Sequence, residues 1–404
     1  MNFIIDSEIF KCITERAAVC SYQKASYLPF WQIKISADQE SQSVSVTAGD
    51  AITFAKITTD RVKVLHSGTV FIDVNDLKKI YNAKGQISVS SDGESLIVKS
   101  DKKKCSIVCR DNEEHFDIPE VNGEMAFRIQ KDQLVGILDR LSPCLKRDGK
   151  EDDIHSGFHF DSRNHRVVTL DGVRLSLCEA DWIYGYTSFT LRGDIEKKLK
   201  KVAGKNDCLL TGYLADRYLY ITGEDFVYYT KVMDGNYLDV NAVIDSNSKR
   251  ISFRASLDQL YTAAKEYDSL GKKNMMYMFG HDGKLVTATI HDNYITSDVI
   301  DTEDTDEQSA ELPDGLITVL NAKFVKELKN ILQGKMITAE IVLKNDFTRI
   351  SNWYFRSDDG YLVLILPCYR RDPSKEEIEV ENKICNFVCP KDDRNSIDDL
   401  SASA

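Results

Sequence analysis

The sequence predicts an α+β protein made of three copies of one domain, each with antiparallel sheets and two helices that pack on one side of them. Phe3, Phe127 and Phe253 each begin a similar stretch, and these starts are 124 and then 126 residues apart. In each copy an apolar residue follows seven positions later and another ten positions later. Short segments in which apolar residues alternate with polar ones recur in every copy, as is typical of half-buried strands. Each copy also contains one late, lysine-rich stretch with helical spacing.

The first copy is expected to span residues 1–122. Ser7 is a typical helix N-cap, and Ile9, Phe10 and Ile13 follow it at helical spacing. Period-two alternation then predicts several strands, interrupted by one short basic helix. We expect that helix at 75–83 and the strands at 31–36, 43–47, 52–57, 86–90, 95–99 and 105–109.

The second copy, 123–248, and the third, 249–371, repeat this order. For the second copy we expect helices at 131–146 and 194–203 and strands at 157–160, 166–170, 174–178, 208–211, 218–222 and 226–232. For the third we expect helices at 256–268 and 322–333 and strands at 275–279, 284–290, 295–300, 337–343 and 361–367. Residues 372–404 are acidic and are expected to form a mobile tail, with the apolar segment 384–389 able to dock on the body.

The net charge of −12 argues against a nucleic-acid partner, but the distribution of charge argues for one. Residues 75–85 carry a net charge of +2, and residues 194–205 and 322–335 carry +3 each. Surface helices often carry lysine, so a single such helix is uninformative. Three helices at equivalent positions indicate a shared basic surface that attracts phosphates.

Composition and missing motifs argue against several other classes of protein. No apolar run reaches the ~18 residues that span a bilayer, and the N-terminus has no signal-peptide pattern, so we expect a cytoplasmic protein that does not contact a membrane. The ten cysteines are too sparse for a disulfide framework. Phosphate-loop, dinucleotide, nucleophile-elbow and zinc-protease motifs are all missing. We therefore expect no catalytic residues, no metal and no cofactor.

One alternative is a metal-dependent hydrolase. His155, His159 and His165 lie close together beside Asp161 and share strand parity. The simpler interpretation is that Phe158 and Phe160 occupy the inward face of the strand and that the histidines lie outside or in a turn.

Two segments with Asp-Gly corners are the most distinctive motifs. They are Leu170-Asp-Gly-Val-Arg-Leu175 and Lys231-Val-Met-Asp-Gly-Asn-Tyr-Leu-Asp-Val240. Together with Leu28-Pro-Phe30, Ala48-Gly-Asp50 and the late strand Leu364-Ile-Leu-Pro-Cys-Tyr-Arg370, they resemble motifs of the bacterial sliding clamp, the beta subunit of DNA polymerase III. The resemblance covers about residues 1–371.

The resemblance implies a head-to-tail homodimer that closes a ring of six similar domains, with sheets outside and helices inside. Double-stranded DNA passes through such a ring, which tethers the polymerase and performs no reaction itself. A sliding ring needs diffuse contact with phosphates rather than with bases. The candidate DNA-facing residues are Lys24, Lys78, Lys79, Lys146, Arg147, Lys197, Lys198, Lys201, Lys265, Lys272, Lys273, Lys326 and Lys329.

The resemblance also implies a pocket that takes a short, apolar-anchored peptide from the polymerase III alpha subunit, the clamp loader and other proteins with a clamp-binding motif. This chain departs from the family pattern at Val173, Asp245, Cys368 and Tyr369. The matching positions are His155, Leu170, Gly172, Val173, Arg174, Leu175, Phe324, Phe347, Leu364, Leu366, Pro367, Cys368 and Tyr369.

For the dimer seam, we expect Lys102, Lys103, Lys104 and Ile107 to face the acidic segment 301–307 of a second copy. The divergent pocket and the added tail also leave open a clamp paralogue that serves repair or a mobile element. A monomeric adaptor that never closes a ring is a further alternative.

Overall fold

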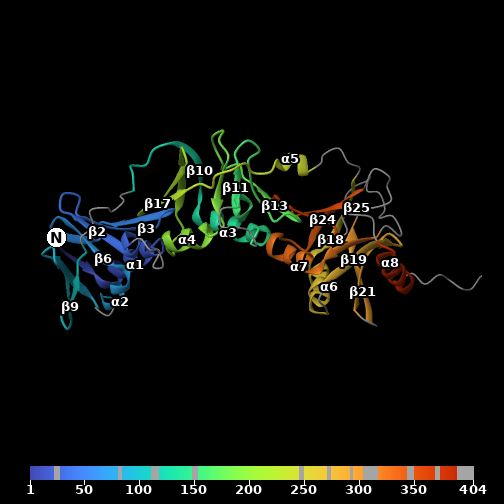
Figure 1. Cartoon of the computed structure of the whole chain (residues 1–404), viewed down its shortest axis with the longest axis horizontal. Coiled ribbons are helices and arrows are strands. Elements are labelled where there is room, and N and C mark those ends of the chain that lie inside the picture. Colours follow the sequence, from blue (N-terminus) through green and yellow to red (C-terminus); the bar gives the residue numbers. More distant parts are fainter. Residues whose placement is uncertain are drawn as a thin grey trace, which may run out of the picture. The chain divides into compact units, whose positions relative to one another are not determined.

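The computed structural model describes two compact units, each of which is α+β with antiparallel sheets, as the sequence predicts (Figure 1). The first unit contains residues 1–139, 150–167 and 180–236, and the second contains 140–149, 168–179 and 237–404. The three predicted domain boundaries do not coincide with these units and stay a prediction. The described residues are 1–21, 28–80, 84–110, 118–147, 153–244, 250–270, 274–291, 294–303, 317–343, 350–368 and 374–388.

An eight-stranded sheet forms the centre of the first unit. Strands from the first and second predicted domains join in it, because β17 pairs with β4 and Tyr228 lies opposite Ala55. In spatial order the strands are β10 (Glu124–Gln130), β15 (Leu209–Ala215), β16 (Tyr218–Thr222), β17 (Phe226–Lys231), β4 (Thr53–Thr59), β3 (Ser43–Gly49), β2 (Gln32–Asp38) and β6 (Gly68–Asp73).

Two helices pack on one face of this sheet. Helix α1 (Ser7–Ala18) lies against β3 and β4, and α4 (Ile195–Val202) lies against β17 and α1. The N-cap of α1 is Asp6, whose carboxylate accepts a hydrogen bond from the Glu8 N–H at 2.9 Å, so Ser7 is the first helical residue rather than the cap. Helical spacing places Phe10 and Ile13 of α1 in the core.

A second, five-stranded sheet belongs to the first unit alone. Its two edges are β5 and β9, and β9 pairs only with β8 among the described strands. The basic helix expected at 75–83 is shorter, because the described part is a 3-10 turn at Val74–Asp76 followed by α2 (Leu77–Ile80). The strands are β5 (Val62–His66), β1 (Asn2–Asp6), β7 (Gln86–Ser91), β8 (Ser95–Lys99) and β9 (Lys104–Val108).

The remaining elements of the first unit include the helix expected at 131–146. It is α3 (Lys131–Leu141), and a 3-10 turn, which belongs to the second unit, follows it at Ser142–Cys144, where Pro143 ends the regular helix. A strand pair, β11 (Gly157–Asp161) and β14 (Phe189–Arg192), buries Phe158 and Phe160 as predicted.

The second unit is built on two sheets. In the first of them β13 (Arg174–Glu179) pairs with β26 (Tyr361–Ile365), so strands of the second and third predicted domains again share one ladder. This sheet continues through β25 (Ile350–Arg356), β24 (Met336–Leu343), β18 (Arg250–Ser256) and β22 (Thr302–Glu303). The other sheet has the order β21 (Tyr294–Ile300), β20 (Lys284–His291), β19 (Met275–His281) and β23 (Thr318–Asn321).

The helices of the second unit are α6 (Leu257–Leu270) and α7 (Ala322–Ile331), which pack side by side, and the short α5 (Val240–Val243). Strands β18, β22, β23 and β25 have no counterpart among the predicted strands. Within the predicted mobile tail, residues 375–388 form helix α8 (Lys375–Val388), which was not predicted from the sequence. Its Ile384 is fully buried, so the expected docking of this apolar segment is observed at that residue.

Candidate functional site

Helix α4 presents lysines on one side and buries its other side. Ile195, Leu199 and Val202 are buried, whereas Lys197 and Lys201 are exposed. Lys198 is different, because its ammonium lies 3.2 Å from Asp194 and 3.5 Å from Asp50. Although burial acts in the opposite direction, these two carboxylates raise the pKa of Lys198 above its usual value. Lys197 and Lys201 are therefore exposed to solvent, as is Lys200, whose ammonium lies 3.8 Å from Asp139.

Helix α2 carries the equivalent pair in the first predicted domain. Lys78 and Lys79 are both exposed, and Lys79 forms an ion pair with Asp76 at 2.5 Å. Exposed pairs of this kind contribute little to stability. The two lysines of α2 therefore keep their positive charges at the solvent-exposed surface.

Two lysines of α7 form ion pairs with residues of α6 inside the second unit. Lys326 forms an ion pair with Asp268, and Lys329 lies 2.5 Å from Asp258, so both connect α7 to α6. Lys265 on α6 is exposed and lies above the Tyr261 ring. Among the other predicted DNA-facing residues, Lys146 is half-buried and Arg147 is exposed, while Lys24, Lys272 and Lys273 lie outside the described residues.

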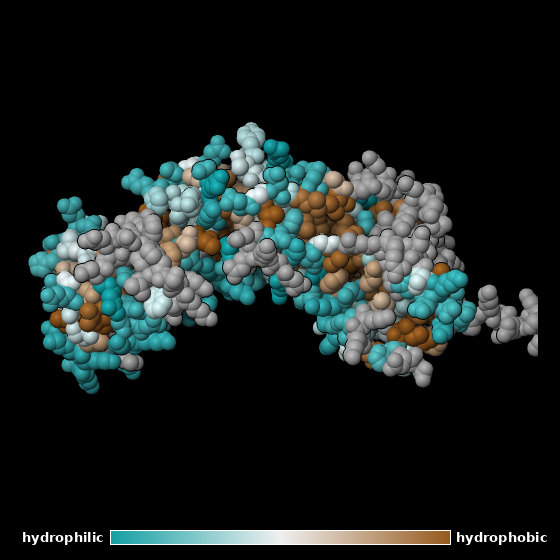
Figure 2. Space-filling model, in the orientation of Figure 1, coloured by the Kyte–Doolittle hydropathy of each residue, from teal (hydrophilic) through white to brown (hydrophobic). Residues whose placement is uncertain are grey.

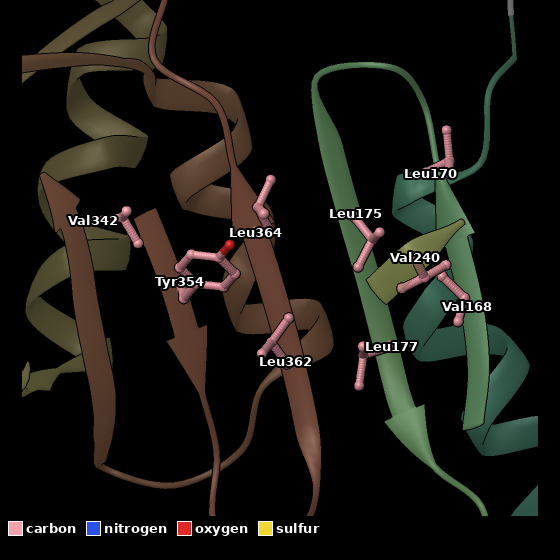
Figure 3. Packing of buried hydrophobic residues seen from close by; sticks show 9 residues of the cluster. All are labelled: Val168, Leu170, Leu175, Leu177, Val240, Val342, Tyr354, Leu362 and Leu364. Carbon is pink, nitrogen blue, oxygen red and sulfur yellow. The ribbon is translucent and has the colours of Figure 1, made fainter. Parts of the chain in front are cut away.

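An apolar cluster fills the second unit where β13 meets β26. Leu175 pairs with Leu364 and Leu177 pairs with Leu362, so four leucines lie on the same side of the sheet (Figure 3). Tyr237, Val243, Ile244 and Leu366 pack at its border and are only partly buried. The buried members are Val168, Leu170, Leu175, Leu177, Val240, Val342, Tyr354, Leu362 and Leu364.

The turn beside this cluster is held by a buried arginine. Asp171 accepts hydrogen bonds from the N–H groups of Val173 and Arg174 at 3.0 and 2.7 Å, and Gly172 takes a φ of +91° that suits glycine. The Arg174 guanidinium, in a residue that is 7% exposed, donates to Asp171, to Glu327 on α7 and to the Pro143 carbonyl. The Asp-Gly corner therefore connects three segments far apart in the sequence.

The predicted pocket residues differ in how deeply they are buried and in the unit to which they belong. Leu170, Leu175 and Leu364 are core residues of the cluster, whereas Leu366 lies at its border. Val173, Pro367 and Phe324 are half-buried, and Gly172 and Cys368 are exposed. His155 belongs to the first unit, where its Nδ1 lies 3.1 Å from Asp153. Phe347 and Tyr369 lie outside the described residues, as does Asp245.

Sequence reasoning missed several residues of this cluster. Tyr354 lies on the unpredicted strand β25, and Val240 lies on α5, whose N-cap is Asp239. The sequence pattern could have predicted Leu362, because it lies two residues before Leu364 on the same strand. It could not have predicted Val240, because a four-residue helix has no detectable periodicity.

The predicted dimer seam requires one correction. Lys102 and Lys104 are exposed and Lys103 is half-buried, but Ile107 is only 3% exposed and is part of the core of the first unit. The alternation of β9 instead turns Val108 outward, and this residue is 65% exposed. In the second unit the edge strand β21 exposes Val299 to a similar degree, 56%.

The three histidines of the alternative metal site have separate partners. His159 Nδ1 lies 3.0 Å from the Thr190 hydroxyl, and His165 Nδ1 lies 3.2 Å from the Ile183 carbonyl. Burial lowers the pKa of His159 to about 4, so its ring is neutral at pH 7. No cluster of three or more potential metal ligands occurs among the described residues. Within the same residues, no helix is long and apolar enough to cross a membrane.

Comparison with known proteins identifies the fold. No protein-family model matches the chain. The curated "Beta sliding clamp" of Proteus mirabilis is 24% identical over 170 residues, which are 40% of this chain and 45% of that relative, so the match spans less than half of the relative's length.

Solved structures match over nearly the whole chain. The DNA polymerase sliding clamp of Bacillus subtilis superposes with a TM-score of 0.77 at 16% identity and covers 92% of this chain and 100% of its own. The beta subunit from the DNA polymerase of Streptococcus pyogenes gives 0.77 at 15% identity, with coverages of 91% and 99%. The Helicobacter pylori beta clamp bound to a DNA ligase peptide gives 0.74 at 16% identity, with 91% and 100%. The chain therefore has the fold of the bacterial DNA sliding clamp, the beta subunit of DNA polymerase III, as the resemblance of its motifs predicts.

Proposed function

We propose that this protein is a DNA sliding clamp, a ring that encircles duplex DNA and tethers a replicative polymerase and other partners to it. The observation that carries the proposal is the set of exposed lysines on helices of a clamp fold. Lys78 and Lys79 on α2 and Lys197 and Lys201 on α4 all keep their charges in solvent. We infer that they contact phosphates weakly and without reading sequence, as a ring that must slide requires.

We further propose that two copies of the chain close the ring through the free sheet edges β9 and β21. A free edge has unpaired N–H and C=O groups and pairs readily with another strand. The apolar Val108 and Val299 are exposed on these strands. Charge supports the same pairing, because Lys102 and Lys104 precede or begin β9, whereas exposed Asp301 and Glu303 follow β21. The pairing would form two identical seams in a head-to-tail dimer.

The apolar cluster supports a binding site for partner peptides. The Helicobacter pylori clamp was solved with a DNA ligase peptide, and the Bartonella birtlesii clamp was solved with griselimycin. We infer that a short peptide places its apolar anchors against Leu366, Val243 and Ile244, which lie partly buried at the border of the cluster. These border residues pack against the buried leucines of the cluster, which form the core beneath the proposed peptide site. The polymerase III alpha subunit and the clamp loader are the proposed partners.

We also propose three clamp domains at 1–122, 123–248 and 249–371. The two sheets that cross the expected boundaries connect neighbouring domains without making them one fold, since each domain keeps its own helices. No reaction is assigned to the chain. The activity to measure is then the retention of the protein on DNA that the closed ring encircles.

Linearisation of a loaded circle tests the proposal. The protein is loaded onto nicked circular plasmid by the clamp loader of its host, free protein is removed by gel filtration, and half of the sample is cut with a single-site restriction enzyme. We expect the protein to remain on the circle and to leave the cut plasmid within minutes. Blocking both ends of the linear DNA with tightly bound proteins should restore retention. Equal retention on cut and uncut DNA would contradict a topological ring.

A further inference from the structure

Helix α8 covers one face of the β21–β20–β19–β23 sheet. Ile384 is 0% exposed, and Val380 and Val388, four residues to either side, pack against the same cluster. This spacing forms one apolar stripe along the 14-residue helix. The surface that it meets consists of Tyr277, Phe279, Val286, Ala288 and Val319.

Helix α6 covers the opposite face of that sheet. Side chains alternate along β20, so Val286 and Ala288 belong to the α8 side and Leu285 and Thr287 belong to the other. The Tyr267 hydroxyl of α6 lies 3.1 Å from the Thr287 carbonyl oxygen. The sheet is thus the middle layer between α6 and α8, and Figure 1 shows the two helices on either side of β19 and β21.

Strand β21 lies at the free edge of this three-layer arrangement. It pairs only with β20 among the described strands, and Ile300 is its one buried residue. From the α6 side, the Tyr267 hydroxyl donates to Asp298 at 2.6 Å. From the other side, α8 packs on β20 and β21. Hydrophobic side chains also gather at the lower right of Figure 2, where Figure 1 places β21.

We propose that α8 holds the edge strand β21 in the position that receives a second copy of the chain, so that this helix sets the strength of the dimer. The inference rests on the dimer seam proposed above. A strand that pairs on one side only and buries one residue frays readily. Packing against α8 orders it before association, which lowers the entropic cost of forming the seam. Because the ring has two seams, loss of α8 packing acts twice in each dimer.

Three substitutions in α8 separate this role from a general effect of the tail. Ile384→Ser removes the buried anchor, whereas Phe387→Ser changes a neighbouring residue that is 52% exposed. The dimer dissociation constant is measured by sedimentation equilibrium of the full chain. We expect Ile384→Ser to raise it by about tenfold or more, equivalent to ~1.4 kcal/mol. Ile384→Leu should restore the unaltered value, and Phe387→Ser should leave it unchanged.

A fourth variant controls for lost stability. Ile341→Ala empties a core position of β24 in the other sheet of the same unit, where Ile341 is 1% exposed. It should lower the unfolding temperature but not the strength of the dimer. An Ile384→Ser dimer as tight as the unaltered one would overturn the inference and leave the ring intact. Equal weakening by Ile341→Ala would also overturn it. If the unaltered chain is a monomer, the proposed seam fails first and the inference fails with it.

Discussion

The guanidinium carbon of Arg174 lies 4.0 Å from the centre of the Phe324 ring, so the turn after β12 (Arg166–Leu170) is stacked on helix α7. The same guanidinium donates to carboxylates of Asp171 and Glu327. A planar cation with several donors in a fork suits this position, since one ammonium cannot serve both carboxylates and stack on the ring. The relationship connects a predicted pocket motif to a predicted DNA-facing helix within one unit.

Replacing Arg174 tests how much this contact stabilises the second unit. Arg174→Ala leaves two largely buried carboxylates without their cation, and we expect the free energy of unfolding to fall by about 3 kcal/mol. Arg174→Lys should recover only part of the loss. Urea unfolding measures both. As a control, Arg217→Ala removes an exposed pair with Asp234, where the arginine side chain is 62% exposed, and should change stability by less than ~0.5 kcal/mol.

Lysines of α4 should govern DNA affinity through salt-dependent contacts. Lys197→Ala combined with Lys201→Ala should weaken binding to duplex DNA of any sequence. Each lost phosphate contact should also reduce the slope of log affinity against log salt by about 0.9. Fluorescence anisotropy at several salt concentrations measures this. The control is Lys56→Ala, an exposed lysine on the face of β4 that points away from α1. Equal slopes for all three proteins would refute the assignment.

The border of the apolar cluster should decide peptide binding. Leu366→Glu places a charge where a peptide anchor is expected, and we predict at least tenfold weaker binding of an apolar-anchored clamp-binding peptide by calorimetry. Its unfolding temperature should stay close to that of the unaltered chain, because Leu366 is only partly buried. By contrast, Leu364→Ala acts on a residue that is 2% exposed and should lower stability by about 2–4 kcal/mol. Full binding by Leu366→Glu would place the site elsewhere.

Acid should destabilise the first unit through His159. Its pKa is about 4 in the folded chain, below the ordinary value of 6.5, so the unfolded chain binds the proton more tightly. The free energy of unfolding should not depend on His159 protonation above pH 6.5. As the pH falls from 6.5 toward 4, it should decrease by at most about 1.4 kcal/mol per pH unit. His159→Gln should flatten the dependence of unfolding on pH in this window. Identical pH profiles would show that other groups cause any acid sensitivity.

Reversing the charge before β9 tests the proposed seam. Substitution of Lys102, Lys103 and Lys104 by glutamate should raise the dimer dissociation constant, most strongly at low salt, because exposed charges are screened within about 10 Å at 0.1 M ionic strength. Sedimentation at two salt concentrations measures the change. Substitution of Lys78 by glutamate reverses one exposed charge outside β9 and serves as a single-site control. A dimer that resists the triple change would exclude these lysines from the seam.

Periodicity predicted helices α1, α3, α4, α6 and α7 and most strands, because their apolar faces follow simple repeats, but it did not predict α5 or α8. Helices α6 and α7 begin within about a residue of the positions expected, since β strands and capping side chains such as Asn321 define their starts. Long-range relationships were not accessible. Nothing in the local sequence pairs Tyr228 with Ala55 or places Lys326 beside Asp268. Helix α8 was missed because its acidic composition outweighed a stripe of only three apolar residues.

The ladder between β17 and β4 has a mechanical consequence for loading onto DNA. Five residue pairs, from Phe226 opposite Ile57 to Thr230 opposite Thr53, join neighbouring parts of the chain by backbone hydrogen bonds. Bending at this junction would break several of these bonds together, so it behaves as a stiff plate rather than as a hinge. If the proposed ring forms, it would part at the contacts between separate molecules to admit a duplex.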